Sequence, residues 1–191
     1  MDLSEKKLIL GSASPRRREL LEGMGFPFTV EPSSSYDEHY DPSLPHREIP
    51  QRLAEGKSLA FPRPLAPDEV LITADTLVLC GDEILGKPSG KDDAARMLRL
   101  LSGRDHQVIT GVCVRSKDSL ISDSDTAHVW FKDLSDGEIR YYIEKYSPMD
   151  KAGAYGIQEW IGYIGIPRIE GSFYTVMGFP THLVYSLLNR L

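Results

Sequence analysis

The sequence contains only two cysteines, Cys80 and Cys113, and neither stands at the spacing of a metal-binding motif. A framework of several disulfides is therefore excluded, and nothing supports a zinc site. Both cysteines fall in segments with the pattern of strands, so we expect reduced thiols in or near the core. Reduced thiols are typical of a cytoplasmic protein.

Long apolar runs are also missing. No run approaches the roughly 20 residues that cross a bilayer, so we expect no membrane partner. Asp2, Glu5, Lys6 and Lys7 precede an apolar run only as long as a strand, which is not the pattern of a secretory signal peptide. Both observations favour a cytoplasmic location.

Positive charge is scarce as well. The formal net charge is -6 at pH 7 and no basic stripe is present, so we expect no nucleic-acid partner. Without a Gly-x-Ser-x-Gly elbow or a Walker loop, serine hydrolases and P-loop enzymes have no support. The chain has 191 residues, 41% of them apolar, which predicts one globular domain or a compact pair of lobes, and we expect residues 1–191 to form a single domain.

Strand and helix patterns alternate along the chain, which predicts an α/β fold. Two long strand patterns flank a polar turn at residues 116–119, and the resulting antiparallel hairpin favours a mixed sheet over a purely parallel one. Ser135 and Glu138 have the spacing of a capping box at a helix start. Strands are expected over residues 8–10, 26–30, 70–79, 83–85, 106–115, 120–131 and 164–169, and helices from residue 15 and over residues 47–61, 92–101, 135–144 and 180–191.

The most informative segment is the turn between the first strand and the first helix. Ser14 is the expected N-cap, with its hydroxyl accepting an amide hydrogen of the first turn, and Pro15 suits the first helical position. Arg16, Arg17 and Arg18 follow at the positive end of the helix dipole, where a bound anion would offset their charge. The pattern indicates a phosphate site, and the alternative is an ordinary helix start with solvated arginines.

Asp75 lies near the middle of the most apolar strand pattern, residues 70–79. An ionised carboxylate there is costly unless it is paired, hydrogen-bonded or next to a metal. Asp75 is therefore a candidate general base or metal ligand, and the alternative is a structural hydrogen bond at a strand edge.

Four further residues carry charge that suits a phosphate and metal site. Asp37 and Glu38 form a carboxylate pair on a polar loop, and such oxygen ligands suit Mg²⁺ or Mn²⁺. Lys87 directly follows a strand, where its ammonium suits a phosphate contact. Lys57 lies within a predicted helix. A loop acid pair and solvated lysines are the alternative interpretation.

Residues 150–158 combine small side chains with two glycines and end at Gln158. The glycines allow close backbone approach to a ligand, and the Gln158 amide offers a donor and an acceptor to a base edge. A plain loop or distorted helix is the alternative. His106 is expected to be a structural, hydrogen-bonded histidine rather than a catalyst.

Taken in this order, these segments resemble the Maf family of nucleotide pyrophosphatases, also called septum formation proteins. Any one segment is weak, but the ordered set spans nearly the whole chain. The matching segments are residues 12–17, 37–38, 57, 74–76, 85–88, 102–104, 110–112, 150–158 and 169–172.

The resemblance implies a mixed α/β fold with a curved sheet flanked by helices and a cleft between two lobes, similar to the inosine triphosphate pyrophosphatases. It also implies a homodimer that hydrolyses nucleoside triphosphates to the monophosphate and pyrophosphate with a divalent metal. Asp75 matches the family's proton acceptor. Arg16, Thr76 and Gln158 match positions that separate the subgroup acting on dTTP and UTP from the subgroup acting on 7-methyl-GTP, which typically has Trp, a residue other than Thr, and Glu there.

The chemistry of the residues fits this reaction. Substitution at the α-phosphorus needs an activated water, charge neutralisation and in-line positioning. We expect Asp75 to activate the water and to hold Mg²⁺ or Mn²⁺ together with Glu38. The residues expected to bind the triphosphate are Ser12, Ser14, Arg16, Arg17, Lys57 and Lys87.

Two other functions compete with this interpretation. One is a nucleotide sensor without catalytic activity that regulates cell division, which needs the arginine-rich turn but not Asp75 with a metal. The other is the same reaction on a purine or modified nucleotide such as 7-methyl-GTP, which the residues at positions 16, 76 and 158 disfavour.

Overall fold

The computed structural model describes residues 6–32, 36, 39–41 and 43–191. Glu38, one of the two predicted metal ligands, lies outside these residues. Within them, no helix is long and apolar enough to cross a membrane.

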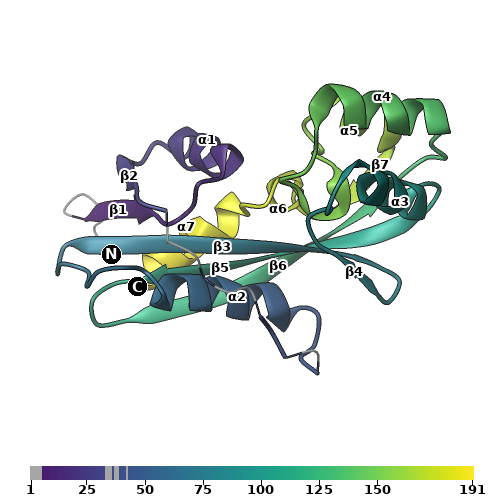
Figure 1. Cartoon of the computed structure of the whole chain (residues 1–191). Coiled ribbons are helices and arrows are strands. Elements are labelled where there is room, and N and C mark those ends of the chain that lie inside the picture. Colours follow the sequence, from purple (N-terminus) through teal and green to yellow (C-terminus); the bar gives the residue numbers. More distant parts are fainter. Residues whose placement is uncertain (1–5, 33–35, 37–38, 42) are drawn as a thin grey trace. The chain divides into compact units, whose positions relative to one another are not determined.

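The fold is mixed α/β, as predicted, with helices flanking a seven-stranded sheet in the order β2-β1-β3-β5-β6-β7, and with β4 paired to β3 (Figure 1). The strands are β1 Lys7–Leu10, β2 Phe28–Val30, β3 Glu69–Cys80, β4 Glu83–Leu85, β5 Asp105–Arg115, β6 Leu120–Trp130 and β7 Arg168–Glu170. The helices are α1 Pro15–Gly23, α2 Glu48–Leu59, α3 Lys91–Leu101, α4 Asp136–Tyr146, α5 Trp160–Gly165, α6 Phe173–Val176 and α7 Thr181–Arg190, with a 3₁₀ turn, η2, at Ala152–Ala154.

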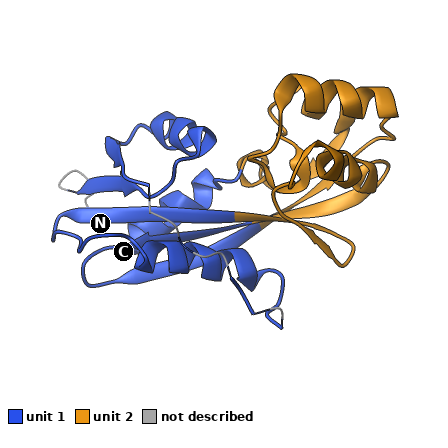
Figure 2. Cartoon of the chain, viewed as in Figure 1, with its two compact units in different colours: residues 1–75, 110–125, 178–191 blue, residues 76–109, 126–177 orange. Residues whose placement is uncertain are grey.

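The chain divides into two compact units (Figure 2). Unit 1 comprises residues 1–75, 110–125 and 178–191, and unit 2 comprises residues 76–109 and 126–177. The boundary falls within β3, between Asp75 and Thr76, and also within β5 and β6. The assignment of all 191 residues to a single domain stays a prediction.

In unit 1, β1 pairs in parallel with both β2 and β3. Alternate side chains of β1 point to opposite faces: Leu8 and Leu10 join one core cluster, and Ile9 joins another. The first cluster packs against α1 and α7, whereas the Thr73 hydroxyl on the other face of β3 donates to the Ala54 carbonyl of α2 at 2.7 Å. Helices α1 and α2 therefore lie on opposite sides of β3 (Figure 1).

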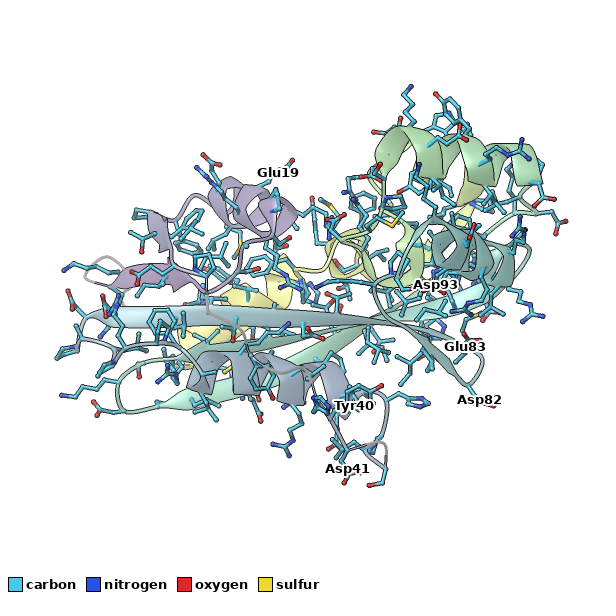
Figure 3. The ribbon with its side chains drawn as sticks, viewed as in Figure 1. Glu19, Tyr40, Asp41, Asp82, Glu83 and Asp93 are labelled. Carbon is cyan, nitrogen blue, oxygen red and sulfur yellow. The ribbon has the colours of Figure 1, made fainter. Side chains whose placement is uncertain are left out.

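In unit 2, β3 turns at Gly81 and Asp82 and pairs antiparallel with β4, and Asp82 lies at the tip of this hairpin (Figure 3). Strand β7 pairs antiparallel with the end of β6. Helix α4 begins with the predicted capping box: the Ser135 hydroxyl accepts from the Glu138 amide, and the Glu138 carboxylate accepts from the Ser135 amide at 2.7 Å.

Two of the elements predicted from the sequence differ in how well the structure matches them. The hairpin of β5 and β6 is confirmed, because the strands are neighbours and the Ser116 amide donates to the Ser119 carbonyl at 2.9 Å. The strand predicted over residues 164–169 is wrong in its first half, since Ile164 and Gly165 belong to α5. A short apolar run suits either structure, and helical hydrogen bonds onto the Glu159 carbonyl decide for the helix.

Candidate functional site

The turn after β1 is held tightly against β3. The Gly11 amide donates to the Ile72 carbonyl at 2.8 Å, and a Cβ at Gly11 would lie 2.8 Å from Thr73 Cγ2. Ser14 is the N-cap of α1 and Pro15 its first residue, as predicted. The predicted capping bond is wrong, because the Ser14 side chain makes no cap hydrogen bond. Instead the Ser12 hydroxyl, two residues earlier, accepts from the Ser14 amide at 3.2 Å.

Arg17 fastens this turn to the rest of unit 1. Its Nη1 donates to the Ala74 carbonyl at 2.7 Å and to the Ser12 hydroxyl at 3.3 Å, and its Nε donates to the Gly178 carbonyl at 2.9 Å. The guanidinium therefore fixes the serine turn beside the residue that precedes Asp75. Arg16 is half-buried, whereas Arg18 is exposed.

Asp75 is paired with Lys57. The Lys57 Nζ lies 2.5 Å from Asp75 Oδ1, and the two side chains are only 17% and 12% exposed. The spacing along β3 puts Thr73 and Asp75 on the same face, and the bond from Thr73 to Ala54 brings α2 onto that face, so Lys57, one helical turn after Ala54, reaches the carboxylate. The partner that a carboxylate in this strand requires is therefore a lysine.

A buried ion pair is weak evidence for stability, because removing two charges from water costs about what their attraction returns. Such a pair on a strand that is mostly apolar is a stronger sign of a functional site. The neighbouring Ala74 carbonyl is already bound by Arg17, so this backbone oxygen is engaged within the protein.

The metal prediction rests on Asp75 and Glu38, of which the structure describes only Asp75. Among the described residues, no three His, Cys, Asp or Glu side chains gather to hold a metal ion. Mg²⁺ is commonly bound through one or two carboxylates together with substrate phosphates, rather than by a cage of protein ligands. A single buried carboxylate fits that mode of binding.

The remaining predicted residues lie in unit 2. Thr76 is half-buried and directly follows Asp75 in β3. Lys87 is exposed just after β4, beside Gly86, whose carbonyl accepts from the Gly153 amide at 3.1 Å. Gln158 is half-buried, and its Oε1 is buried without a hydrogen-bond partner in the described part of the chain.

The two glycines of residues 150–158 make room for the protein itself. Gly153 has φ +70°, and a Cβ there would lie 3.1 Å from Val78. A Cβ at Gly156 would lie 3.0 Å from Glu159 Cδ and 3.1 Å from Lys151 Cε. Both glycines therefore allow close packing against β3 and against two charged side chains, and close approach to a ligand stays a prediction.

Sequence reasoning missed the polar network behind this segment. Lys151 is buried and pairs with Asp150 at 2.8 Å and with Glu159 at 3.2 Å. The Tyr142 hydroxyl donates to Glu159 and accepts from the Gly156 amide at 3.0 Å. In the sequence, Tyr142 cannot be distinguished from an ordinary core aromatic residue of α4. The one available signal of the network is Glu159, the acidic residue that directly follows Gln158.

His106 is structural, as expected. It is buried, its Nε2 lies 2.7 Å from the Tyr155 hydroxyl, and its ring stacks on Phe131. Its Nδ1 has no hydrogen-bond partner in the parts of the chain that the structure describes. Cys80 and Cys113 are also buried, and both are free thiols in the described structure.

Burial lowers the pKa of His106 from 6.5 to about 4. The unfolded chain therefore binds a proton between pH 6.5 and pH 4 that the native state does not, so the stability contributed by this group is complete above pH 6.5 and falls as the pH drops toward 4. We expect His106→Asn to reduce the slope of unfolding free energy against pH in this window, measured by urea unfolding. An unchanged slope would contradict the buried, neutral histidine.

Comparison with known proteins agrees with the resemblance. A protein of Bacteroides thetaiotaomicron named dTTP/UTP pyrophosphatase is 47% identical over 190 residues, which cover 100% of this chain and 98% of that protein. Proteins with the same name from Parabacteroides distasonis (99% of this chain and 98% of that protein covered) and Porphyromonas gingivalis (98% and 96%) are each 49% identical.

A solved structure of a HAM1 protein from Coxiella burnetii matches 97% of this chain and 100% of that chain with a TM-score of 0.51 and 11% sequence identity, which is a likeness of fold. The family model described as Maf-like protein matches residues 7–191. That match covers all of the strands and helices described above. The chain belongs to the Maf family.

Proposed function

We propose that this chain hydrolyses dTTP and UTP to the monophosphate and pyrophosphate, by metal-assisted attack of water at the α-phosphorus. The observation that carries the proposal is the buried Asp75 carboxylate, held by Lys57 on a strand that is mostly apolar. The relatives named dTTP/UTP pyrophosphatase, which match over nearly their whole length, support the reaction and the substrates.

Asp75 accepts the proton of the attacking water. Lys57 binds Oδ1, so we assign the water to the second carboxylate oxygen. The ammonium compensates the negative charge that burial would otherwise disfavour, and it fixes the carboxylate in one orientation. Lys57 therefore has two proposed roles. It holds the Asp75 carboxylate, which is the general base, and it binds the triphosphate.

We assign binding of the triphosphate to cationic and hydroxyl groups of the turn after β1, together with Lys57 and Lys87. Arg17 already holds the protein backbone, because its Nε donates to the Gly178 carbonyl and its Nη1 to the Ala74 carbonyl. It therefore fixes the turn as well as adding positive charge. The proposed phosphate-binding set is Ser12, Ser14, Arg16, Arg17, Lys57 and Lys87.

Mg²⁺ or Mn²⁺ bound by Asp75 and Glu38 would neutralise charge on the phosphate oxygens and lower the pKa of a bound water. The protein's own contribution is to present the Asp75 carboxylate in a site that is largely shielded from water, where electrostatic interactions are stronger than in solution.

Selectivity for the base is assigned to Arg16, Thr76 and Gln158. Uracil and thymine carry an N3–H donor flanked by carbonyl acceptors. The Gln158 Oε1 accepts from N3–H while its amide nitrogen donates to a ring carbonyl. The buried Oε1, which has no partner in the described structure, supports this role, since a buried acceptor normally finds a donor.

Gln158→Glu tests the assignment. The glutamate offers only acceptors, so one of the two bonds to the base is lost and kcat/KM for dTTP is expected to fall by about 10- to 100-fold. Hydrolysis of 7-methyl-GTP, measured in the same assay of pyrophosphate release, is expected to rise relative to dTTP. Gln107→Glu, the same change at a half-buried position of β5, is the matched control. Equal selectivity of the Gln158 variant and the control would remove Gln158 from the base site.

A cytoplasmic location and a homodimer complete the proposal. The buried free thiols of Cys80 and Cys113 support a reducing compartment. The homodimer rests on the family resemblance alone, and sedimentation equilibrium of the purified chain tests it.

A further inference from the structure

We propose that Tyr142, Lys151 and Glu159 form a positioning triad that holds Gln158 for the pyrimidine base. This inference rests on the proposed function and names residues beyond those that match the family's known selectivity positions. The triad contacts the turn that carries Gln158 and is not assigned any contact with substrate.

The carboxylate of Glu159 is the centre of the triad. Its Oε2 accepts from the Tyr142 hydroxyl, and its Oε1 lies 3.2 Å from Lys151 Nζ. The Tyr142 side chain is fully buried, and the Lys151 side chain is 10% exposed. Both oxygens of the carboxylate are therefore engaged by side chains that have little freedom to move.

The same tyrosine also holds the backbone before Gln158. Its hydroxyl accepts from the Gly156 amide at 3.0 Å while it donates to Glu159. One phenol thus joins the residue two positions before Gln158 to the residue directly after it. Burial and the adjacent Glu159 carboxylate raise the pKa of Tyr142, so the phenol keeps the proton that it donates.

Packing removes the remaining freedom of the turn. A Cβ at Gly156 would lie 3.0 Å from Glu159 Cδ, so the Glu159 side chain packs directly against the backbone at Gly156. On the other side, a Cβ at Gly162 would lie 1.8 Å from the Ile157 carbonyl oxygen, and Ile157 itself is buried. The backbone on both sides of Gln158 is therefore fixed by contacts within unit 2.

This rigidity explains how the acceptor of Gln158 stays available. An unsatisfied buried oxygen costs free energy, and a mobile turn would let it reach water or another donor. A fixed turn prevents that relaxation. The conformational entropy of the Gln158 amide is therefore lost when the protein folds and not when the substrate binds.

The triad is tested with Tyr142→Phe, which removes one hydroxyl and keeps the ring. The substrates compared are dTTP and dCTP, because cytosine has no N3–H that could donate a hydrogen bond to the Gln158 Oε1. We expect KM for dTTP to rise about tenfold, kcat to change less than twofold, and the ratio of kcat/KM for dTTP over dCTP to fall about tenfold. A merely structural role would lower kcat for both substrates equally and leave their ratio unchanged.

Two further comparisons keep the test decisive. Tyr141→Phe, the control on the same helix, removes an exposed hydroxyl that is bonded to Lys145, and it should leave the ratio unchanged. Glu159→Gln keeps an acceptor for the Tyr142 hydroxyl and should retain more of the dTTP preference than Glu159→Ala does. A ratio that stays at the wild-type value in both Tyr142→Phe and Glu159→Ala overturns the triad.

The outcomes separate this inference from the function that it rests on. A wild-type chain that prefers dTTP, with the preference reduced in Gln158→Glu but not in the triad variants, contradicts the triad and leaves the proposed function standing. A wild-type chain with no preference between dTTP and dCTP contradicts the proposed selectivity itself.

Discussion

Replacing Asp75 by asparagine is expected to lower kcat for pyrophosphate release from dTTP by about 10³-fold or more, because the amide neither accepts the water's proton nor carries the charge that holds Lys57 and that the proposed mechanism uses to bind the metal. The two side chains have nearly the same shape, so the fold should persist. Single-turnover release of pyrophosphate at saturating dTTP measures the loss, and circular dichroism monitors the fold.

The change also leaves the Lys57 ammonium without its carboxylate partner, which is expected to cost roughly 3 kcal/mol of stability. Combining Asp75→Asn with Lys57→Met removes both charges and should recover most of that stability without recovering activity. Asp82→Asn, at the exposed tip of the β3–β4 hairpin (Figure 3), should change neither property. Wild-type turnover in the Asp75 variant would refute its role as the base.

Replacing Gly111 by alanine is expected to destabilise the protein by roughly 3 kcal/mol or more, the upper part of the range for overpacking. A Cβ at this position of β5 would lie 2.3 Å from the Gln51 nitrogen and from the Pro50 carbonyl, both in the backbone of α2. Backbone cannot move aside as a flexible side chain can, so α2 must shift. Because α2 carries Lys57, the molecules that still fold should also lose activity.

Urea unfolding measures this effect through the transition midpoint. Gly137→Ala in α4 is the matched control, since the nearest atom to its Cβ would be the Ser135 hydroxyl oxygen at 3.9 Å. Alanine is the better helix former, so the control should be neutral or slightly stabilising. A Gly111 variant with the wild-type midpoint would mean that α2 does not pack against β5 as described.

Much of the fold could be predicted because local patterns decide it. The apolar run of β3, the capping box of Ser135 and Glu138, and the proline at the start of α1 each depend on residues close together in the sequence. The burial of the two cysteines could be predicted for the same reason, because both lie in segments with the local pattern of a strand. The prediction of a strand over residues 164–169 failed at Ile164 and Gly165, where a short apolar run fits a helix as well as a strand and contacts with the preceding turn decided between them.

The site was less predictable, because its geometry depends on contacts between distant segments. The position of Asp75 in an apolar strand indicates a buried carboxylate that needs a partner, but only the packing of α2 on β3 identifies Lys57. The arginine-rich turn indicates a phosphate site, yet its sequence does not reveal that Arg17 reaches the Ala74 and Gly178 carbonyls. Hydrogen bonds between distant segments produce no periodic pattern of residues in the sequence.

Analysis of the products formed from dTTP by the purified chain with Mg²⁺ or Mn²⁺ tests the central claim most directly. We expect equal amounts of dTMP and pyrophosphate, the corresponding products from UTP, and lower rates with the other nucleoside triphosphates. Release of dTDP and inorganic phosphate would contradict attack at the α-phosphorus. Binding of dTTP without any turnover would contradict catalysis altogether and identify a nucleotide sensor instead.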